Sequence, residues 1–390
     1  MNQLRDVVAG AAKLSSLADK YATVDLGDGF SFDDVPPMSR DETTAAAREA
    51  IRRSDRPAYL FTSGGSTGVP HLAWIPAELH VREIERHWQP FAPGDVVANL
   101  AMPGRLWSAH LFYNRLAERV GAGVIGLGHV DEEEWPGWAD FLYAQGTTAV
   151  VGTPSQLADL VRFLTERRHQ LLAQLRTAVW FGEPFTARQE EVLHAADIAI
   201  HGNYGSTETW VIGHNGPDCA TDSFHLLPHQ HVELVDGAVL ITGLHPDAVG
   251  PVIRYRIGDR GEWTTCRCGQ PALRVLGRDH QLVKFAGTLV DPGELARVAA
   301  AQPGVQGVQI ALTEDQPGHA ETVELRLVAT ASVDPRAVRD RVLAAHIDLA
   351  FGLRGHEDEA MPVRLVEWLE RIDRTAKTPV VLRQKRKAQR

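Results

Sequence analysis

The residues that could do chemistry begin with seven that are all glycine or carry a hydroxyl: Thr62, Ser63, Gly64, Gly65, Ser66, Thr67 and Gly68. Glycine has no Cβ, so the backbone can turn successive N–H groups toward one point. Such a nest of N–H groups suits phosphate oxygens, and the hydroxyls add neutral donors. Apolar runs at Ala58–Phe61 and Leu72–Ile75 predict a strand before the loop and a strand or helix start after it. The composition therefore predicts a loop that holds a polyphosphate.

The loop is not a P-loop, because no Gly-Lys-Ser/Thr closes it and Val69–His71 follow instead. Two other interpretations of the loop remain open. Gly64–Gly68 fits the G-x-S-x-G pattern, in which Ser66 would be the nucleophile of a serine hydrolase. A solvated turn without a function has the same composition.

A second candidate site combines the three cysteines of the chain with one histidine: Cys219, His225, Cys266 and Cys268. Three thiolates and one imidazole make the tetrahedral donor set of a structural zinc site. Three cysteines are too few for a disulfide framework. The alternative is three inert thiols beside one of 17 histidines.

Length and composition limit the class of protein. The 390 residues suffice for two or three domains, and 44% hydrophobic with 23% charged residues is ordinary for a globular protein. No apolar run approaches the roughly 20 residues of a membrane span, and Met1–Asp6 lacks the apolar core of a signal peptide. We therefore expect a cytoplasmic protein without a membrane partner. The net charge of −10 argues against a nucleic-acid partner, despite the basic stretch Arg383–Arg390.

Apolar runs alternate with helical patterns through most of the chain. Residues 1–60 are mostly helical in pattern, with Asp41–Arg53 the best example. The strand candidates are 95–100, 148–152, 177–181 and 198–200, and the helix candidates are 155–164 and 187–195. This alternation predicts an α/β domain with a substantially parallel sheet. Gly121–Gly126 matches G-x-G-x-x-G, but a helical pattern precedes it, so it predicts a helix–strand connection rather than a dinucleotide site.

Toward the C-terminus the pattern becomes richer in predicted strands. Asp236-Gly237 is a hairpin signal between two apolar runs. After Gly277 about 110 residues remain, enough for a small α+β domain. Its predicted elements are strands at 305–312, 321–330 and 361–366 and a helix at 334–349.

Five short motifs follow one another in order: Thr62–Gly68, Asn203–Glu208, Arg254–Asp259, Gly277-Arg278 and Arg374–Lys377. From about residue 30 onward this order resembles the adenylate-forming superfamily of acyl- and aryl-CoA synthetases, luciferases and peptide-synthetase adenylation domains. The resemblance implies an α/β fold with two domains. Residues 1–277 would form a large ATP- and acid-binding domain with mixed and parallel sheets. Residues 278–390 would form a small, mobile α+β lid that carries the catalytic lysine.

The resemblance also implies the reaction. A carboxylate attacks the α-phosphate of ATP with Mg²⁺ bound, and pyrophosphate leaves. Negative charge accumulates on phosphate oxygens, so positioning and electrostatic stabilisation dominate. The implied roles are triphosphate binding for the loop 62–68, adenine-side contacts for Gly182, Glu183 and Tyr204, an α-phosphate contact for Thr207, Mg²⁺ binding for Glu208, ribose binding for Asp259, ribose and phosphate contacts for Arg278, and charge stabilisation for Lys377. Lys385 and Lys387 are alternatives to Lys377.

Within the superfamily the chain looks most like the phenylacetate–CoA ligase branch. Pro251–Arg256 and the Cys-x-Cys-Gly ahead of Gly277-Arg278 match that branch. Members of the branch can carry a zinc knuckle, so the resemblance implies structural Zn²⁺ on the three cysteines and His225. It also implies a thiol acceptor, coenzyme A first and a carrier protein second.

The predicted acid pocket involves Trp107, His110, Trp180, Gly205 and Trp210. Large aromatic walls favour a flat aryl acid as the small-molecule substrate. The same tryptophans could be ordinary core residues. The identity of the acid and the oligomeric state stay open.

The chain departs from the family pattern in three places. No lysine follows Gly68, the hinge aspartate is shifted to Asp279 or replaced by His280, and Lys284–Gly287 lacks the usual arginine. These departures leave adenylation credible and bear on the transfer to a thiol. A nitrogen or other non-thiol acceptor, or a non-catalytic ATP-binding relative, therefore remains an alternative.

Overall fold

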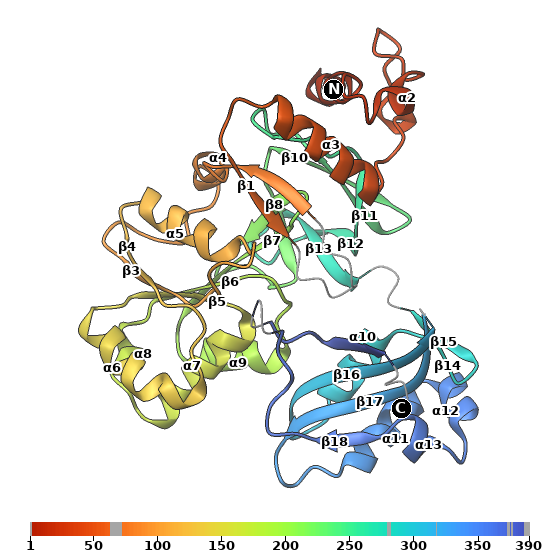
Figure 1. The fold of residues 1–390 in the computed structure, drawn as a ribbon. Helices are drawn as coiled ribbons and strands as arrows, with labels where there is room; N and C mark the ends of the chain where they lie inside the picture. The colour runs from red at the N-terminus through yellow and green to blue at the C-terminus, as the bar shows by residue number, and fades with distance from the viewer. Residues whose placement is uncertain are drawn as a thin grey trace. The chain divides into compact units, whose positions relative to one another are not determined.

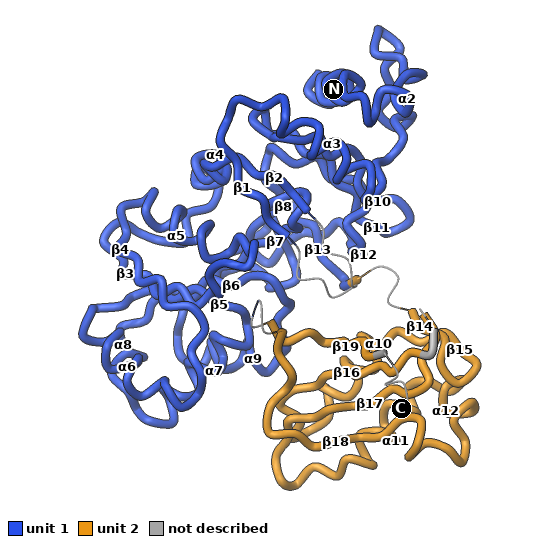
Figure 2. The backbone as a smooth tube through the Cα atoms, viewed as in Figure 1, with its two compact units in different colours: residues 1–277, 374–376 blue, residues 278–373, 377–390 orange. Residues whose placement is uncertain are grey.

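We describe the computed structural model of the chain over residues 2–62, 72–278, 282–316, 318–372, 375 and 377–385. The chain forms two compact units, 1–277 with 374–376 and 278–373 with 377–390 (Figure 2). Several residues considered above lie outside the described residues: Ser63, Gly64, Gly65, Ser66, Thr67, Gly68, His71, Asp279, His280 and Lys387, together with the side chain of Lys385. What was expected of them stays a prediction.

Short helices form the N-terminal part of unit 1. They are α1 (Asn2–Ala11), α2 (Ala18–Tyr21), the 3-10 helix η1 (Phe32–Asp34) and α3 (Arg40–Arg53). At the start of α3 the Ser39 hydroxyl accepts from the Glu42 N–H at 3.3 Å, and the Glu42 carboxylate accepts from the Ser39 N–H at 2.6 Å. This capping box satisfies two backbone donors that the first turn leaves unpaired. The helix predicted at Asp41–Arg53 is confirmed.

An 11-stranded sheet is the body of unit 1 (Figure 1). Its strand order is β10-β11-β12-β13-β9-β8-β7-β6-β5-β3-β4. The parallel strands are β3 (Val96–Asn99), β4 (Gly123–Gly126), β5 (Ala149–Gly152), β6 (Thr177–Trp180) and β7 (Ala199–Ser206). The others are β8 (Trp210–Asn215), β9 (Ser223–Leu226), β10 (Gln230–Val235), β11 (Ala238–Gly243), β12 (Tyr255–Thr265) and β13 (Pro271–Arg278). The predicted α/β class with a mixed sheet is confirmed.

Helices cover both faces of the parallel strands. The 3-10 helix η2 (Glu132–Glu134) directly precedes α6 (Trp135–Ala144). One hydrophobic cluster joins the sheet to α6, α7 (Pro154–Glu166), α8 (Leu171–Gln174) and α9 (Ala187–Ala195). A second cluster joins it to α4 (Val81–Glu85) and α5 (Ala109–Arg119). Val150 packs in the first cluster and Val151 in the second, because successive strand residues point to opposite faces. Burial on both faces explains why these strands read as continuous apolar runs.

Among the strands that the structure describes, the two that flank the glycine-rich loop pair with each other and with no third strand. β1 (Ala58–Thr62) and β2 (Leu72–Pro76) are antiparallel, with Thr62 opposite Leu72. The segment after the loop is therefore a strand rather than a helix start.

Unit 2 is a six-stranded sheet with helices. Its strands are β14 (Val283–Phe285), β15 (Thr288–Val290), β16 (Val305–Gln316), β17 (His319–Ala329), β18 (Val363–Leu365) and β19 (Val381–Lys385). Its helices are α10 (Pro292–Ala300), α11 (Pro335–Ala345), α12 (Ile347–Leu353) and α13 (Glu357–Ala360). The single helix predicted over 334–349 is wrong, because His346 takes φ −132° and ψ 77°, outside the helical region, and separates α11 from α12. Within the described part of the chain, no helix has the length and apolarity to cross a bilayer.

Candidate active site

Two adjacent parallel strands of unit 1 end at the same edge of the sheet. Trp180 at the end of β6 lies in register with Gly202 of β7. This places several predicted site residues at one edge: Gly182 and Glu183 after β6, and Tyr204, Gly205, Thr207 and Glu208 at the end of β7. In open α/β sheets, ligands bind outside the carboxyl ends of the strands.

Glu183 is held against the start of a helix. The Ser155 N–H and hydroxyl donate to Glu183 Oε1 at 3.1 and 2.7 Å. Ser155 is in the first turn of α7, where unpaired N–H groups and the helix dipole favour a carboxylate. Gly182 has φ +85°, which suits glycine. The sharp turn after β6 and this clamp fix the backbone of the predicted adenine-side segment.

The turn between β7 and β8 has a closely determined shape. The Ser206 hydroxyl accepts from the Thr209 N–H at 3.2 Å, and Trp210 takes φ +65°. A Cβ on Gly205 would lie 2.4 Å from the Trp210 carbonyl oxygen, so only glycine fits there. Thr207 and Glu208 are therefore carried on a turn with little freedom.

Two of the predicted carboxylates, Glu208 for Mg²⁺ and Asp259 for the ribose, are each paired with a tyrosine hydroxyl. Tyr255 OH donates to Glu208 Oε1 at 3.0 Å, and Tyr204 OH donates to Asp259 Oδ2 at 2.7 Å. Both pairs join the β7 region to β12. Asp259 follows Gly258, whose φ is +86°, where the β11–β12 register is irregular. Such bulges re-aim side chains, which accounts for the direction of Asp259.

Two of the predicted pocket tryptophans share one aromatic cluster. The Trp210 ring stacks on Phe61 at 5.7 Å between centroids, and its Nε1 donates to the Leu79 carbonyl at 3.0 Å. Trp107 lies 5.6 Å from Phe181, and both tryptophans belong to the cluster on the α4–α5 face. The structure thus brings them to one side of the sheet.

Of the two other predicted pocket residues, Trp180 lies on the opposite face of the sheet, whereas His110 contacts Ala101 of the α4–α5 cluster. Trp180 packs in the cluster on the α6–α9 face, 5.2 Å from Phe185, so the structure does not bring it to Trp107 and Trp210. Neighbouring strand residues face opposite ways, and Trp180 follows Val179 of the α4–α5 cluster. His110 at the start of α5 is half-buried, and its Nδ1 lies 2.7 Å from the Ala101 carbonyl oxygen.

Three predicted site residues remain: Thr62 in unit 1, and Arg278 and Lys377 in unit 2. In unit 1 the Thr62 N–H donates to the Leu106 carbonyl at 2.9 Å, which ties the end of β1 to the segment that carries Trp107. In unit 2 Arg278 is exposed. Lys377 is half-buried, and its carbonyl accepts from the Ile372 N–H at 2.9 Å.

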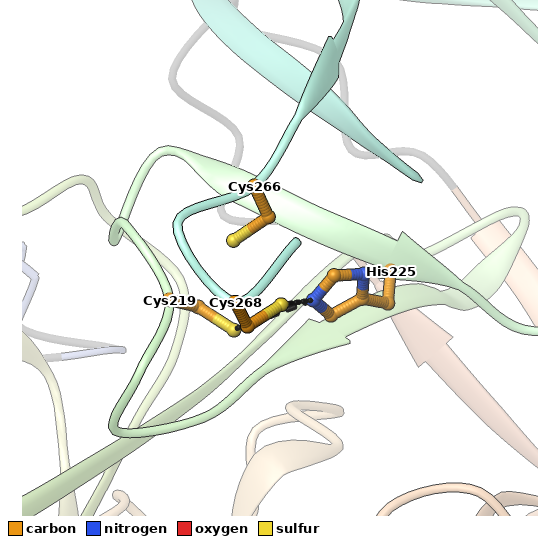
Figure 3. A group of neighbouring side chains, drawn as sticks. All are labelled: Cys219, His225, Cys266 and Cys268. Atoms are coloured by element: carbon orange, nitrogen blue, oxygen red, sulfur yellow. Dashed lines mark hydrogen bonds between the residues drawn. The ribbon is translucent and has the colours of Figure 1, made fainter. Parts of the chain in front are cut away.

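The cysteines and His225 converge on one point of unit 1 (Figure 3). One donor atom from each of Cys219, His225, Cys266 and Cys268 lies within 4.8 Å of the others. His225 Nε2 is 3.3 Å from the Sγ atoms of both Cys219 and Cys268. The structure brings together four residues that span 50 positions of sequence.

The surroundings of this cluster fit a metal centre. His225 Nδ1 lies 2.9 Å from the Pro271 carbonyl oxygen, so the Nδ1–H is held there and Nε2 faces the sulfurs. Metal-binding histidines are typically oriented by such a bond. The Cys266–Gly269 turn closes with a 2.8 Å bond from the Gly269 N–H to the Cys266 carbonyl. Three sulfurs and one imidazole nitrogen are the donor chemistry of a structural zinc site.

Three residues of this region escaped the sequence interpretation: Ser155, Gln230 and Tyr255. Tyr255 lies inside a motif that had been recognised, but its partner Glu208 is 47 residues away. Ser155 contacts Glu183, and Gln230 donates its side-chain amide to the Thr209 and Val211 carbonyls of the turn after β7. No local sequence pattern indicates either contact.

The comparisons with known proteins agree with this architecture. The relatives include indoleacetate–lysine synthetase of Pseudomonas savastanoi, 23% identical over 72% of this chain and 74% of that protein. They also include CymA of Salinispora arenicola, named a probable non-canonical nonribosomal peptide synthetase, 36% identical over 87% of this chain. The match spans only 5% of the length of CymA.

Solved structures show the same fold. The structure of a 2-hydroxyisobutyryl-CoA ligase in the postadenylation state gives a TM-score of 0.74 at 16% identity, covering 98% of this chain and 88% of the ligase. ATP-bound MatB from Rhodopseudomonas palustris gives 0.57 at 21% identity, covering 82% and 66%. The family model for AMP-binding enzymes matches residues 5–242. With that match across most of unit 1, the chain belongs to the AMP-binding, adenylate-forming enzyme family.

Proposed function

We propose that this enzyme activates a carboxylic acid with ATP. A carboxylate oxygen of the acid attacks the α-phosphorus, the bond to the β-phosphate breaks, and pyrophosphate leaves with the bonding electrons. The observation that carries the proposal is the pair of tyrosine-held carboxylates, Glu208 with Tyr255 and Asp259 with Tyr204, at the edge where β6 and β7 end.

The chemistry of these groups suggests their roles. Glu208 offers carboxylate oxygens to Mg²⁺, which prefers oxygen ligands. Asp259 can accept hydrogen bonds from both ribose hydroxyls. The loop 62–68 would hold the β- and γ-phosphates and Thr207 the α-phosphate. Residues 1–277 would form the ATP- and acid-binding domain, and 278–390 a lid that supplies Arg278 and Lys377 to the developing charge.

The acid that fits best is an aryl acid. Trp107 and Trp210 belong to one aromatic cluster on a single face of the sheet, and flat rings pack favourably against such walls. The relative from Pseudomonas savastanoi is named for indoleacetate, an aryl-substituted acid. A phenylacetate–CoA ligase-like enzyme would use an acid of the same class.

Coenzyme A or a carrier protein would be the acceptor in such a ligase. A second candidate is a nitrogen nucleophile, because the same relative is named a synthetase that joins its acid to lysine. The absence of arginine in the Lys284–Gly287 segment favours this alternative.

A hydroxylamine-trapping screen with ATP and Mg²⁺ tests the proposal. Aryl and alkyl acids are compared, and an acyl hydroxamate that requires ATP supports adenylation. Coenzyme A and lysine are then added separately to the best acid, and faster release of AMP identifies the acceptor. Labelling of Ser66 by a fluorophosphonate without any ATP-dependent product would favour a serine hydrolase instead.

We also propose that Cys219, His225, Cys266 and Cys268 bind a structural Zn²⁺. The four donors would leave no open coordination position, so the ion would tie the β8–β9 loop to the β12–β13 turn. Metal analysis of the purified protein should find about one zinc per chain, and Cys268→Ser should reduce it while the exposed His194→Gln should not. Zinc-free protein with an unchanged melting temperature would overturn the assignment.

A further inference from the structure

A buried glutamine braces the turn that carries Thr207 and Glu208. Gln230, the first residue of β10, is 6% exposed. Its side-chain Nε2 donates to the Thr209 carbonyl at 2.7 Å and to the Val211 carbonyl at 3.0 Å. These two carbonyls flank Trp210, which takes the left-handed φ of +65°. A bulky residue in that conformation persists only where its surroundings impose it.

The ladder between β7 and β8 is interrupted at the same place. Tyr204 lies opposite Gly213 and Gly205 opposite Val211, so Ile212 has no partner residue on β7. The Ile212 carbonyl instead accepts from the Leu227 N–H at 2.9 Å. A segment before β10 thus supplies hydrogen-bond donors where the sheet does not.

This segment, Leu227–Gln230, is itself firmly anchored. The Gln230 N–H donates to the Leu227 carbonyl at 3.0 Å, and the His229 carbonyl accepts from the Leu244 N–H at 2.8 Å. The Gln230 side chain thus bonds the turn after β7, and the backbone of the preceding residue His229 bonds Leu244 just after β11. Together these bonds link the turn to the end of β11.

We propose that Gln230 is a positioning residue for acid activation, an inference that rests on the function proposed above. By holding the Thr209 and Val211 carbonyls, the amide fixes the φ of Trp210. This in turn sets the direction of the Glu208 carboxylate and of the Trp210 indole. Misplacing a Mg²⁺ ligand by about 1 Å is enough to slow a reaction by up to two orders of magnitude.

Gln230→Met and Gln230→Glu test the proposal, with Gln174→Met as the matched control. Gln174 lies in the same unit and also donates its amide to a backbone carbonyl, that of Tyr143 at 3.2 Å. Met keeps the length of the side chain and removes the donor, whereas Glu places a charge against two carbonyls. In pyrophosphate exchange we expect the Met variant to lose about tenfold in kcat and to need more Mg²⁺ for half-activation, and the Glu variant to lose more. A glutamine with a purely structural role would lower the melting temperature and leave the Mg²⁺ dependence of the folded enzyme unchanged, which would overturn the proposal.

A second measurement does not depend on activity. Hydrogen–deuterium exchange of peptides covering 204–212 should be at least several-fold faster in Gln230→Met than in the parent, and unchanged in Gln174→Met. Equal exchange in Gln230→Met and the parent would overturn the brace even if the parent is fully active. If the parent activates no acid, the proposed function fails, and the exchange result still decides whether Gln230 braces the turn.

Discussion

Lowering the pH should destabilise unit 1 through three buried histidines whose rings are in contact. The rings of His80 and His229 lie on His245, each with centroids 3.6 Å from it. All three side chains are buried, at 5%, 8% and 8% exposure. Among the described residues no partner pairs either ring nitrogen of His245. The three rings connect the turn before α4, the segment before β10 and the loop after β11.

Burial sets the sign of the effect. It lowers the pKa of His80 from 6.5 to about 4, and burial with neighbouring histidines lowers those of His229 and His245 to about 4 and about 2. In the unfolded chain these groups bind protons near pH 6.5, so between that pH and the folded pKa the unfolded state holds more protons. Stability is therefore full above pH 6.5 and falls as the pH drops toward 4. One ring alone accounts for about 2 kcal/mol by pH 5 and about 3 kcal/mol by pH 4.

The assay is urea unfolding at pH 7, 6 and 5, followed by tryptophan fluorescence. Eight of the nine tryptophans lie in unit 1, so the signal reports chiefly on that unit. His245→Phe keeps a stacked ring and removes the proton site, and it should reduce the loss of unfolding free energy between pH 7 and 5 by about 2 kcal/mol. The exposed His194→Gln serves as control and should match the parent. Equal pH dependence in His245→Phe and the parent would show that His245 does not titrate on unfolding.

Three further substitutions test particular contacts. Tyr255→Phe removes the phenol that donates to the candidate magnesium-binding carboxylate, and adenylation should fall about tenfold with little change in melting temperature. Gly202→Ala puts a Cβ 2.3 Å from the Trp180 ring and should cost about 1–3 kcal/mol in urea unfolding, whereas Gly243→Ala, with no atom within 4 Å, should not. Lys377→Ala should slow adenylation about a hundredfold or more without weakening nucleotide binding as much; normal adenylation would show that another lysine acts.

Most of the fold could be predicted from the sequence, because the patterns that indicate helices and strands are local. Short apolar runs predicted β3, β5, β6 and the start of β7, and Ser39 with Glu42 marks the start of α3 within four residues. The helix predicted over 334–349 failed because the break at His346 comes from backbone angles that the apolar pattern does not encode. The roles assigned to the two parts of the chain stay predictions.

The site was only partly predictable. Residue types and motif order pointed to Glu208 and Asp259, but their tyrosine partners are 47 and 55 residues away in the chain. Trp180 was predicted in the acid pocket but packs in the α6–α9 cluster. The residue type and the neighbouring motif do not indicate which face of the sheet a tryptophan occupies. The convergence of the three cysteines with His225 was predictable, because three thiols and one imidazole make the donor set of a structural zinc site, and the metal itself stays a prediction.

We have proposed that this chain adenylates a carboxylic acid with Glu208 at the metal. Incorporation of labelled pyrophosphate into ATP tests it most directly, with Mg²⁺ and the acid that gave the most hydroxamate. The exposed Glu191, which pairs with Arg188, provides the matched control. We expect acid-dependent exchange in the parent and in Glu191→Gln, and a loss of about a hundredfold or more in Glu208→Gln. Exchange that needs no acid, or that persists unchanged in Glu208→Gln, would contradict it.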